Sequence, residues 1–171
     1  MNQDNHIVLV GLPGVGKTSI GEKLSEMLMM DYIDIDYEIE SDQEIAINDF
    51  IQSHSVSEFR LIEKDKLDKV LDGNSPLVIS SGGGIVLDKG NRNLIKEKSV
   101  GVYIKCDIDE IANRVDIKSR PLLYNTNKKP QLLNFWNERK EMYSEVSKIE
   151  VDITGLDLKK SIIKVYNKIN E

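Results

Sequence analysis

Short apolar runs alternate with segments of helical periodicity along the whole chain. The runs are rich in β-branched residues or alternate apolar with polar positions, both of which are typical of strands. Between them, apolar residues recur at the spacing of one face of an amphipathic helix. Strands are predicted at residues 6–10, 32–36, 76–79, 99–104 and 149–153. Helices are predicted around residues 20–28, 44–71, 87–98, 108–115, 131–146 and 158–169.

Strands that alternate with helices in this way usually pair in parallel, because each helix carries the chain back along a face of the sheet. We therefore expect an α/β fold, with a five-stranded parallel sheet flanked by helices on both faces. No internal repeat, linker or low-complexity tract divides the sequence, so we expect a single domain over residues 1–171.

Composition and charge exclude several classes of protein. The net charge of −6 disfavours non-specific attraction to nucleic acid or to an anionic membrane. No apolar stretch is long enough to span a bilayer, and the polar residues 1–6 do not resemble a signal peptide. The only cysteine, Cys106, cannot form an internal disulfide, which suits a reducing compartment. We expect a cytoplasmic protein, and nothing in the sequence requires more than a monomer.

Residues 11–18 match the GxxxxGK[ST] phosphate-binding loop (P-loop) between a predicted strand and a predicted helix. The glycines let backbone N–H groups turn toward one point, and the N-terminus of the helix adds positive charge there. Lys17 is expected to neutralise the β- and γ-phosphates of ATP, and the Thr18 hydroxyl to ligate Mg²⁺. Nucleotide contacts are expected from Gly11, Gly14, Val15, Gly16, Lys17, Thr18 and Ser19. The motif alone does not distinguish a kinase from an ATPase or a nucleotide-dependent switch.

Two carboxylates, Asp34 and Asp36, lie at the end of the second predicted strand, with their side chains on the same face. Ligands bind at this end of parallel sheets. Two such carboxylates repel unless a cation or a proton donor lies between them. Mg²⁺ and a substrate hydroxyl would meet that need, whereas a solvated strand end is the alternative interpretation. Together with a P-loop, the pair favours phosphoryl transfer.

Glycines and arginines provide further candidates. Gly82, Gly83 and Gly84 follow a predicted strand, where missing side chains permit close backbone approach to a ligand and unusual dihedral angles, or form only a flexible turn. Arginine binds carboxylate and phosphate bidentately. Arg60 and Arg139 lie in predicted helices near aromatic residues.

The other three arginines have different settings. Arg120 precedes Pro121 in a polar loop, from which it could fold over a transferring phosphoryl group and stabilise its charge. Arg92 and Arg114 are predicted to be surface charges.

In their order along the chain, these residues resemble the shikimate kinase family. The resemblance rests on the P-loop, Tyr32-Ile-Asp34-Ile-Asp36, Phe59-Arg60 with Glu63, Gly82-Gly83-Gly84, Arg120-Pro121-Leu122-Leu123, and Arg139 with Tyr143. It implies a nucleoside-monophosphate-kinase-like fold, with a substrate-binding region at about residues 34–61 and a lid at about 114–130. It also implies that ATP and shikimate give ADP and shikimate 3-phosphate, in the pathway to chorismate and the aromatic amino acids.

The resemblance assigns roles to the candidates. Asp34 would position Mg²⁺, and Asp36 would bind the acceptor hydroxyl as its candidate base. Arg60 and Arg139 would bind the shikimate carboxylate, with backbone contacts from Gly82, Gly83 and Gly84. Arg120 would reach the phosphates from the lid, so Lys17, Asp36 and Arg120 are the expected catalytic residues.

The sequence departs from the family pattern at two places. Ser55-Val56 stands where the family usually has Gly-Glu, and Glu141 replaces a frequent proline. We expect these changes to affect substrate affinity rather than the reaction class. We also expect Glu63, one helical turn beyond Arg60, to orient that arginine.

Three other functions fit parts of the sequence. A gluconate kinase would explain the P-loop and the carboxylates, but has less need for two arginines facing one carboxylate. An adenylate-kinase-like enzyme should show nucleotide-acceptor motifs, which we do not find. A nucleotide switch without turnover is disfavoured by the intact Lys17, Thr18, Asp34 and Asp36.

Overall fold

The computed structural model describes residues 5–114 and 128–171. Within them, five parallel strands form one sheet in the order β2-β3-β1-β4-β5. The strands are β1 His6–Val10, β2 Asp31–Asp34, β3 Leu77–Ser80, β4 Ser99–Lys105 and β5 Ser147–Asp152. The predicted five-stranded parallel sheet is confirmed.

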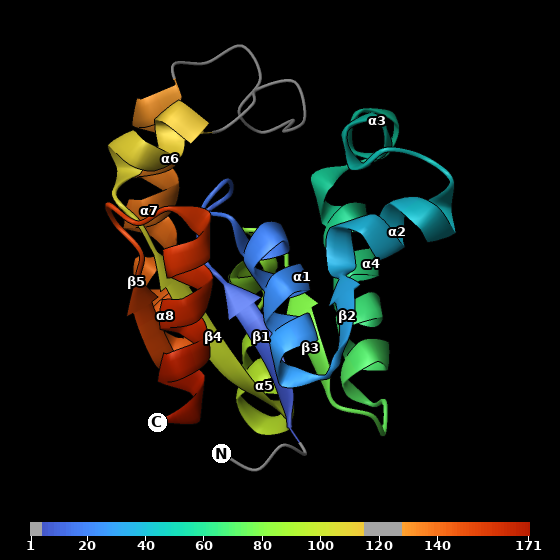
Figure 1. Cartoon of the computed structure of the whole chain (residues 1–171). Coiled ribbons are helices and arrows are strands. Elements are labelled where there is room, and N and C mark those ends of the chain that lie inside the picture. Colours follow the sequence, from blue (N-terminus) through green and yellow to red (C-terminus); the bar gives the residue numbers. More distant parts are fainter. Residues whose placement is uncertain (1–4, 115–127) are drawn as a thin grey trace.

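Helices cover both faces of this sheet (Figure 1). They are α1 Lys17–Leu28, α2 Ile35–Gln43, α3 Ile47–Ser53, α4 Val56–Leu71, the 3₁₀ helix η1 Ile85–Leu87, α5 Lys89–Lys98, α6 Ile108–Arg114, α7 Lys128–Val146 and α8 Leu158–Asn170. Helices α1 and α8 pack together on one face, and α4, α5 and α7 lie behind the other. The central strand β1 is buried along its whole length, as expected for a strand between two helical layers.

The second strand is shorter than predicted, because Asp34 caps a helix. Its side chain accepts hydrogen bonds from the backbone amides of Asp36 and Tyr37, at 3.0 and 3.4 Å. A side chain that satisfies these otherwise unpaired amides starts the helix at the next residue. The prediction that Asp34 and Asp36 share one face of a strand is therefore wrong, since Asp36 lies in the first turn of α2.

The helical region predicted at residues 44–71 is divided into α3 and α4. Ser55, which departs from the family pattern, begins α4 by accepting a hydrogen bond from the Glu58 amide at 3.1 Å. The Ser55 hydroxyl also contacts the Glu58 carboxylate, so the two residues cap the helix together. The departure at residue 55 thus serves the start of the helix that carries Arg60.

Arg92 is not the surface charge that we predicted. Its guanidinium donates hydrogen bonds to the carbonyl oxygens of Val86 and Leu87, and pairs with Glu145 at 2.8 Å. It therefore links η1 to α7, behind the glycine run. In the described part of the chain, no helix is both long enough and apolar enough to cross a membrane.

Candidate active site

The P-loop connects β1 to α1 through backbone conformations that only glycine adopts easily. Gly11, Gly14 and Gly16 have positive φ angles of 147°, 83° and 106°. Gly16 is the residue at which α1 begins, so the loop amides and the N-terminus of the helix face one region. Lys17 is almost fully buried, and its ammonium donates to the carbonyl oxygens of Gly11 and Leu12 at 2.9 and 3.0 Å. The loop thus has the form of a phosphate site.

Thr18 and Asp34 come together beside this loop. The Thr18 hydroxyl donates to Asp34 Oδ2 at 2.9 Å, and the Tyr32 hydroxyl lies 3.4 Å from the same oxygen. A hydroxyl and a carboxylate are the hard oxygen donors that suit Mg²⁺, which usually keeps several waters and takes few protein ligands. In residues 5–114 and 128–171, no group of three or more His, Cys, Asp or Glu side chains could hold a metal ion. Thr18 and Asp34 could hold such an ion through one or two oxygens.

A cleft of about 260 Å³ lies between the P-loop, α2–α4, the glycine run and α7. It brings together eight predicted site residues: Thr18, Asp34, Asp36, Arg60, Gly82, Gly83, Gly84 and Arg139. Val56, which belongs to the first departure from the family pattern, also lines this cleft. Glu141 does not, so the two departures lie in different surroundings.

The glycine run is needed because protein groups approach it closely. A Cβ atom at Gly82 would lie 2.8 Å from Asp36 Oδ1, and one at Gly83 would lie 2.6 Å from Pro13 Cδ. A Cβ atom at Gly84 would overlap the Arg60 guanidinium. None of Gly82, Gly83 and Gly84 has a positive φ, so the run does not use the left-handed conformations that glycine permits. The missing side chains instead let these backbone atoms contact the acid, the arginine and the P-loop.

Arg60 is positioned by a buried acid from its own helix. Its guanidinium pairs with Glu63 Oε2 at 2.6 Å, and the Glu63 side chain is completely buried. Burial raises the pKa of Glu63 to about 7, and the nearby Arg60 charge opposes that rise. The contact that we expected between Glu63 and Arg60 is present.

Arg139 enters the same cleft from α7. Its guanidinium stacks over the Phe135 ring, 4.0 Å from the centroid, and donates to the Gly83 carbonyl oxygen at 3.3 Å and to Glu138 at 2.9 Å. The Tyr143 hydroxyl also donates to the Gly83 carbonyl oxygen, at 2.5 Å. Arg139 and Tyr143 thus both bind the backbone carbonyl of Gly83, which connects α7 to the glycine run.

A second cavity, of about 290 Å³, lies beside the P-loop, and four of the predicted nucleotide-binding residues line it. It is lined by the P-loop residues Gly14, Val15, Gly16 and Ser19, by Ile20 and Arg114, and by Ile153, Leu156, Asp157, Leu158 and Ser161. Arg114 is exposed, as predicted, and its side chain also lines this cavity while pairing with Glu110 at 2.6 Å. Sequence reasoning assigned no contact to its lining residues beyond the P-loop, because the loop between the last strand and the last helix carries no motif.

Arg120 and nearly all of the predicted lid fall in residues 115–127, outside the described part of the chain. Phe135 lines the cleft, whereas its neighbour Trp136 lines a third cavity on another side of α7.

Comparison with known proteins agrees with this geometry. The family model for shikimate kinase matches residues 13–170. The shikimate kinase of Mesorhizobium japonicum is 35% identical over 158 residues, which cover 92% of this chain and 76% of that protein. The structure of the shikimate kinase from Acinetobacter baumannii in complex with shikimate superposes with a TM-score of 0.92 at 28% identity, covering 97% of this chain and 93% of that one. A gluconokinase from Sinorhizobium meliloti, with a TM-score of 0.61 and 14% identity, shares the fold alone; the alignment covers 99% of this chain and 94% of that one.

Proposed function

The chain belongs to the shikimate kinase family, and we propose that it transfers the γ-phosphoryl group of ATP to the 3-hydroxyl of shikimate in the cleft that Arg60 and Arg139 line. One observation carries this proposal: a single cleft joins Thr18 of the P-loop and Asp34, at the end of β2, to two arginines and one further acid, Asp36. An anionic acceptor held by the arginines would present a hydroxyl between Asp36 and the phosphates.

The phosphate end of the reaction rests on the P-loop. Its amides and Lys17 would hold the β- and γ-phosphates, and Lys17 would exchange its carbonyl partners for phosphate oxygens. Thr18 and Asp34 would hold Mg²⁺, which neutralises phosphate charge when bound. The cavity beside the P-loop lies where the nucleoside would extend, with Arg114 in its wall.

The acceptor end rests on the cleft. Arg60 and Arg139 would bind the carboxylate of shikimate, because two guanidinium groups give bidentate, charge-assisted hydrogen bonds. Asp36 would accept the proton of the attacking hydroxyl as the phosphoryl group arrives. The Gly82–Gly84 backbone, which lines the cleft without side chains, would contact the ring.

The remaining assignments are also proposals. We propose one domain over residues 1–171, a substrate-binding region at about 34–61, and a monomer that works in the cytoplasm. Arg120, from a lid at about 114–130, would reach the phosphates during transfer. Size-exclusion chromatography with light scattering tests the monomer, and a dimer at micromolar concentration would refute it.

The decisive experiment is a coupled ADP-release assay with Mg·ATP over shikimate, quinate, gluconate and nucleoside monophosphates. We expect ADP release that depends on shikimate, with the other acceptors at least about tenfold poorer in kcat/KM, because quinate and gluconate place their hydroxyls differently relative to the carboxylate and nucleoside monophosphates have no carboxylate. A clear preference for gluconate, or turnover that is independent of shikimate, would overturn the proposal.

A further inference from the structure

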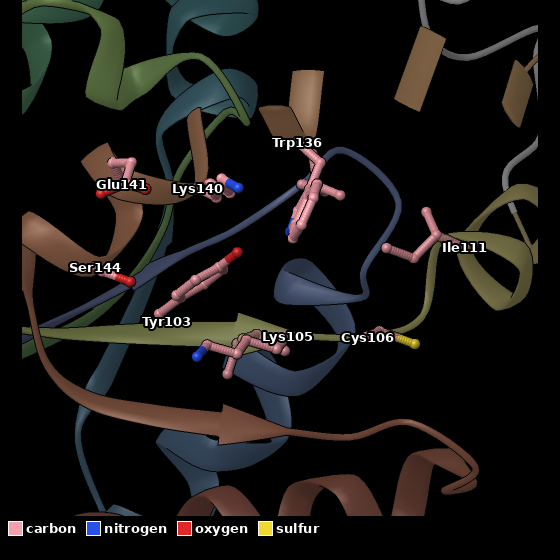
Figure 2. Close-up of a pocket in the computed structure, with 10 residues that line it drawn as sticks. Tyr103, Lys105, Cys106, Ile111, Trp136, Lys140, Glu141 and Ser144 are labelled. Atoms are coloured by element: carbon pink, nitrogen blue, oxygen red, sulfur yellow. The ribbon is translucent and has the colours of Figure 1, made fainter. Parts of the chain in front are cut away.

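A third cavity, of about 290 Å³, lies between the end of β4, the first residues of the P-loop, α6 and α7 (Figure 2). Among the described residues, it shares no lining residue with the cleft or with the cavity beside the P-loop. None of the described residues to which the proposed kinase reaction gives a role lines it. Its volume is close to the lower end of the range of small-molecule sites, about 300–1,000 Å³. A ligand of one ring would fill much of it.

One part of this third cavity is apolar and aromatic. Leu12, from the P-loop, and Ile111, from α6, are almost fully buried and form part of its wall. The rings of Tyr103 and Trp136 face the same space from β4 and α7. Two aromatic rings beside aliphatic groups favour a flat ring, which can stack or meet them edge to face.

Hydrogen-bond donors lie close together at another part of the third cavity. Figure 2 shows the Lys140 amine and the Tyr103 hydroxyl both pointing toward Trp136. Burial is the main cause that raises the pKa of Tyr103 to about 12, so its hydroxyl keeps its proton at neutral pH. Lys140 and Trp136 offer only donors. This group of side chains is complementary to an acceptor such as a carboxylate.

Lys140 is the charge available to that acceptor. Its ammonium lies 4.4 Å from the centroid of the Trp136 ring, and no carboxylate of the described residues forms an ion pair with it. Lys105, the other lysine of the lining, is already paired with Glu150. Glu141 also lines the cavity and would oppose a second negative charge on a ligand. With Lys140 as the available cation and Glu141 as a nearby acid, the cavity suits a singly charged anion better than a phosphate dianion.

We propose that this third cavity is a binding site for a small aromatic carboxylate. The ring would lie against Trp136, Tyr103 and the apolar wall, and the carboxylate would accept hydrogen bonds from Lys140 and Tyr103. The site is separate from the one that binds shikimate, so it does not depend on the assigned reaction.

Trp136 gives a direct measurement, because it is the only tryptophan of the chain. We would titrate the full chain with benzoate and follow tryptophan fluorescence, with shikimate and ADP present at saturation so that Arg60 and Arg139 are occupied. We expect a saturable change with benzoate. Benzamide, which has the same shape without the charge, should bind at least about tenfold more weakly, and acetate should give no change.

Variants at residue 140 locate the anion. Lys140→Met keeps the aliphatic stem and should weaken benzoate binding about tenfold or more, whereas Lys140→Arg should retain it. Lys159→Met, at an exposed position of α8, is the matched control and should bind benzoate as the unchanged protein does. Equal binding of benzoate and benzamide, unchanged binding by Lys140→Met, or loss of the signal when shikimate and ADP are present would each overturn the proposal.

Discussion

Glu63 should make the stability of this protein depend on pH in a way that one substitution removes. The residue is completely buried, and burial raises its pKa from 4.5 to about 7. In the unfolded chain the same carboxyl titrates near its ordinary value. Between these two pH values the folded state therefore holds a proton that the unfolded state has released. Glu63→Gln removes this titration while keeping an oxygen that can accept from Arg60.

The sign follows from the proton count. Because the folded state binds more protons, the contribution of Glu63 to the free energy of unfolding is greatest below pH 4.5 and falls as the pH rises to about 7. The difference between the two pKa values corresponds to about 3 kcal/mol at about 1.36 kcal/mol per pH unit, as an upper bound. Relative to Glu63→Gln, the unchanged protein should thus lose up to about 3 kcal/mol between acidic pH and pH 8.

Urea unfolding of both proteins at several pH values from 5 to 8, followed by far-UV circular dichroism, measures this difference. Taking the difference between two proteins cancels the titration of every other group that the substitution leaves undisturbed. Glu97→Gln, at an exposed position of α5, is the matched control and should give a flat difference. A flat difference for Glu63→Gln as well, or one that rises with pH, would refute the claim that Glu63 is a buried acid with a raised pKa.

Three further variants test the site. Asp36→Asn should lower kcat by about 10²-fold or more with little change in the KM for shikimate, if this acid accepts the hydroxyl proton; near-normal turnover would remove it from that role. Arg139→Lys should raise the KM for shikimate at least about tenfold and leave ADP affinity unchanged by calorimetry, because an ammonium cannot bind a carboxylate bidentately; an equal loss for ADP would mean that the residue is misplaced. Gly83→Ala should lower the free energy of unfolding by about 1–3 kcal/mol in urea, since its methyl group would lie 2.6 Å from Pro13; unchanged stability would show that the contact relaxes freely.

Local rules explain why several features could be predicted without coordinates. The P-loop is a short motif whose glycines, lysine and threonine lie in one continuous stretch of the sequence, so its residues alone identify it. The strand and helix order follows from periodicity, which is also local. Local rules failed where two of them compete. Asp34 could have continued a strand, but its side chain satisfies the amides that start α2.

The sequence by itself therefore determined the fold class, the phosphate loop and the set of charged residues available for chemistry. Only the tertiary structure decided which of them meet. Arg60 and Arg139 are far apart in the chain, and both reach the cleft because Gly82–Gly84 lets α4 and α7 approach the same backbone. Trp136 and Arg139 are one turn apart on α7, yet they line different cavities. Burial, which sets the pKa of Glu63, is likewise a property of packing between distant segments, and no local pattern encodes it.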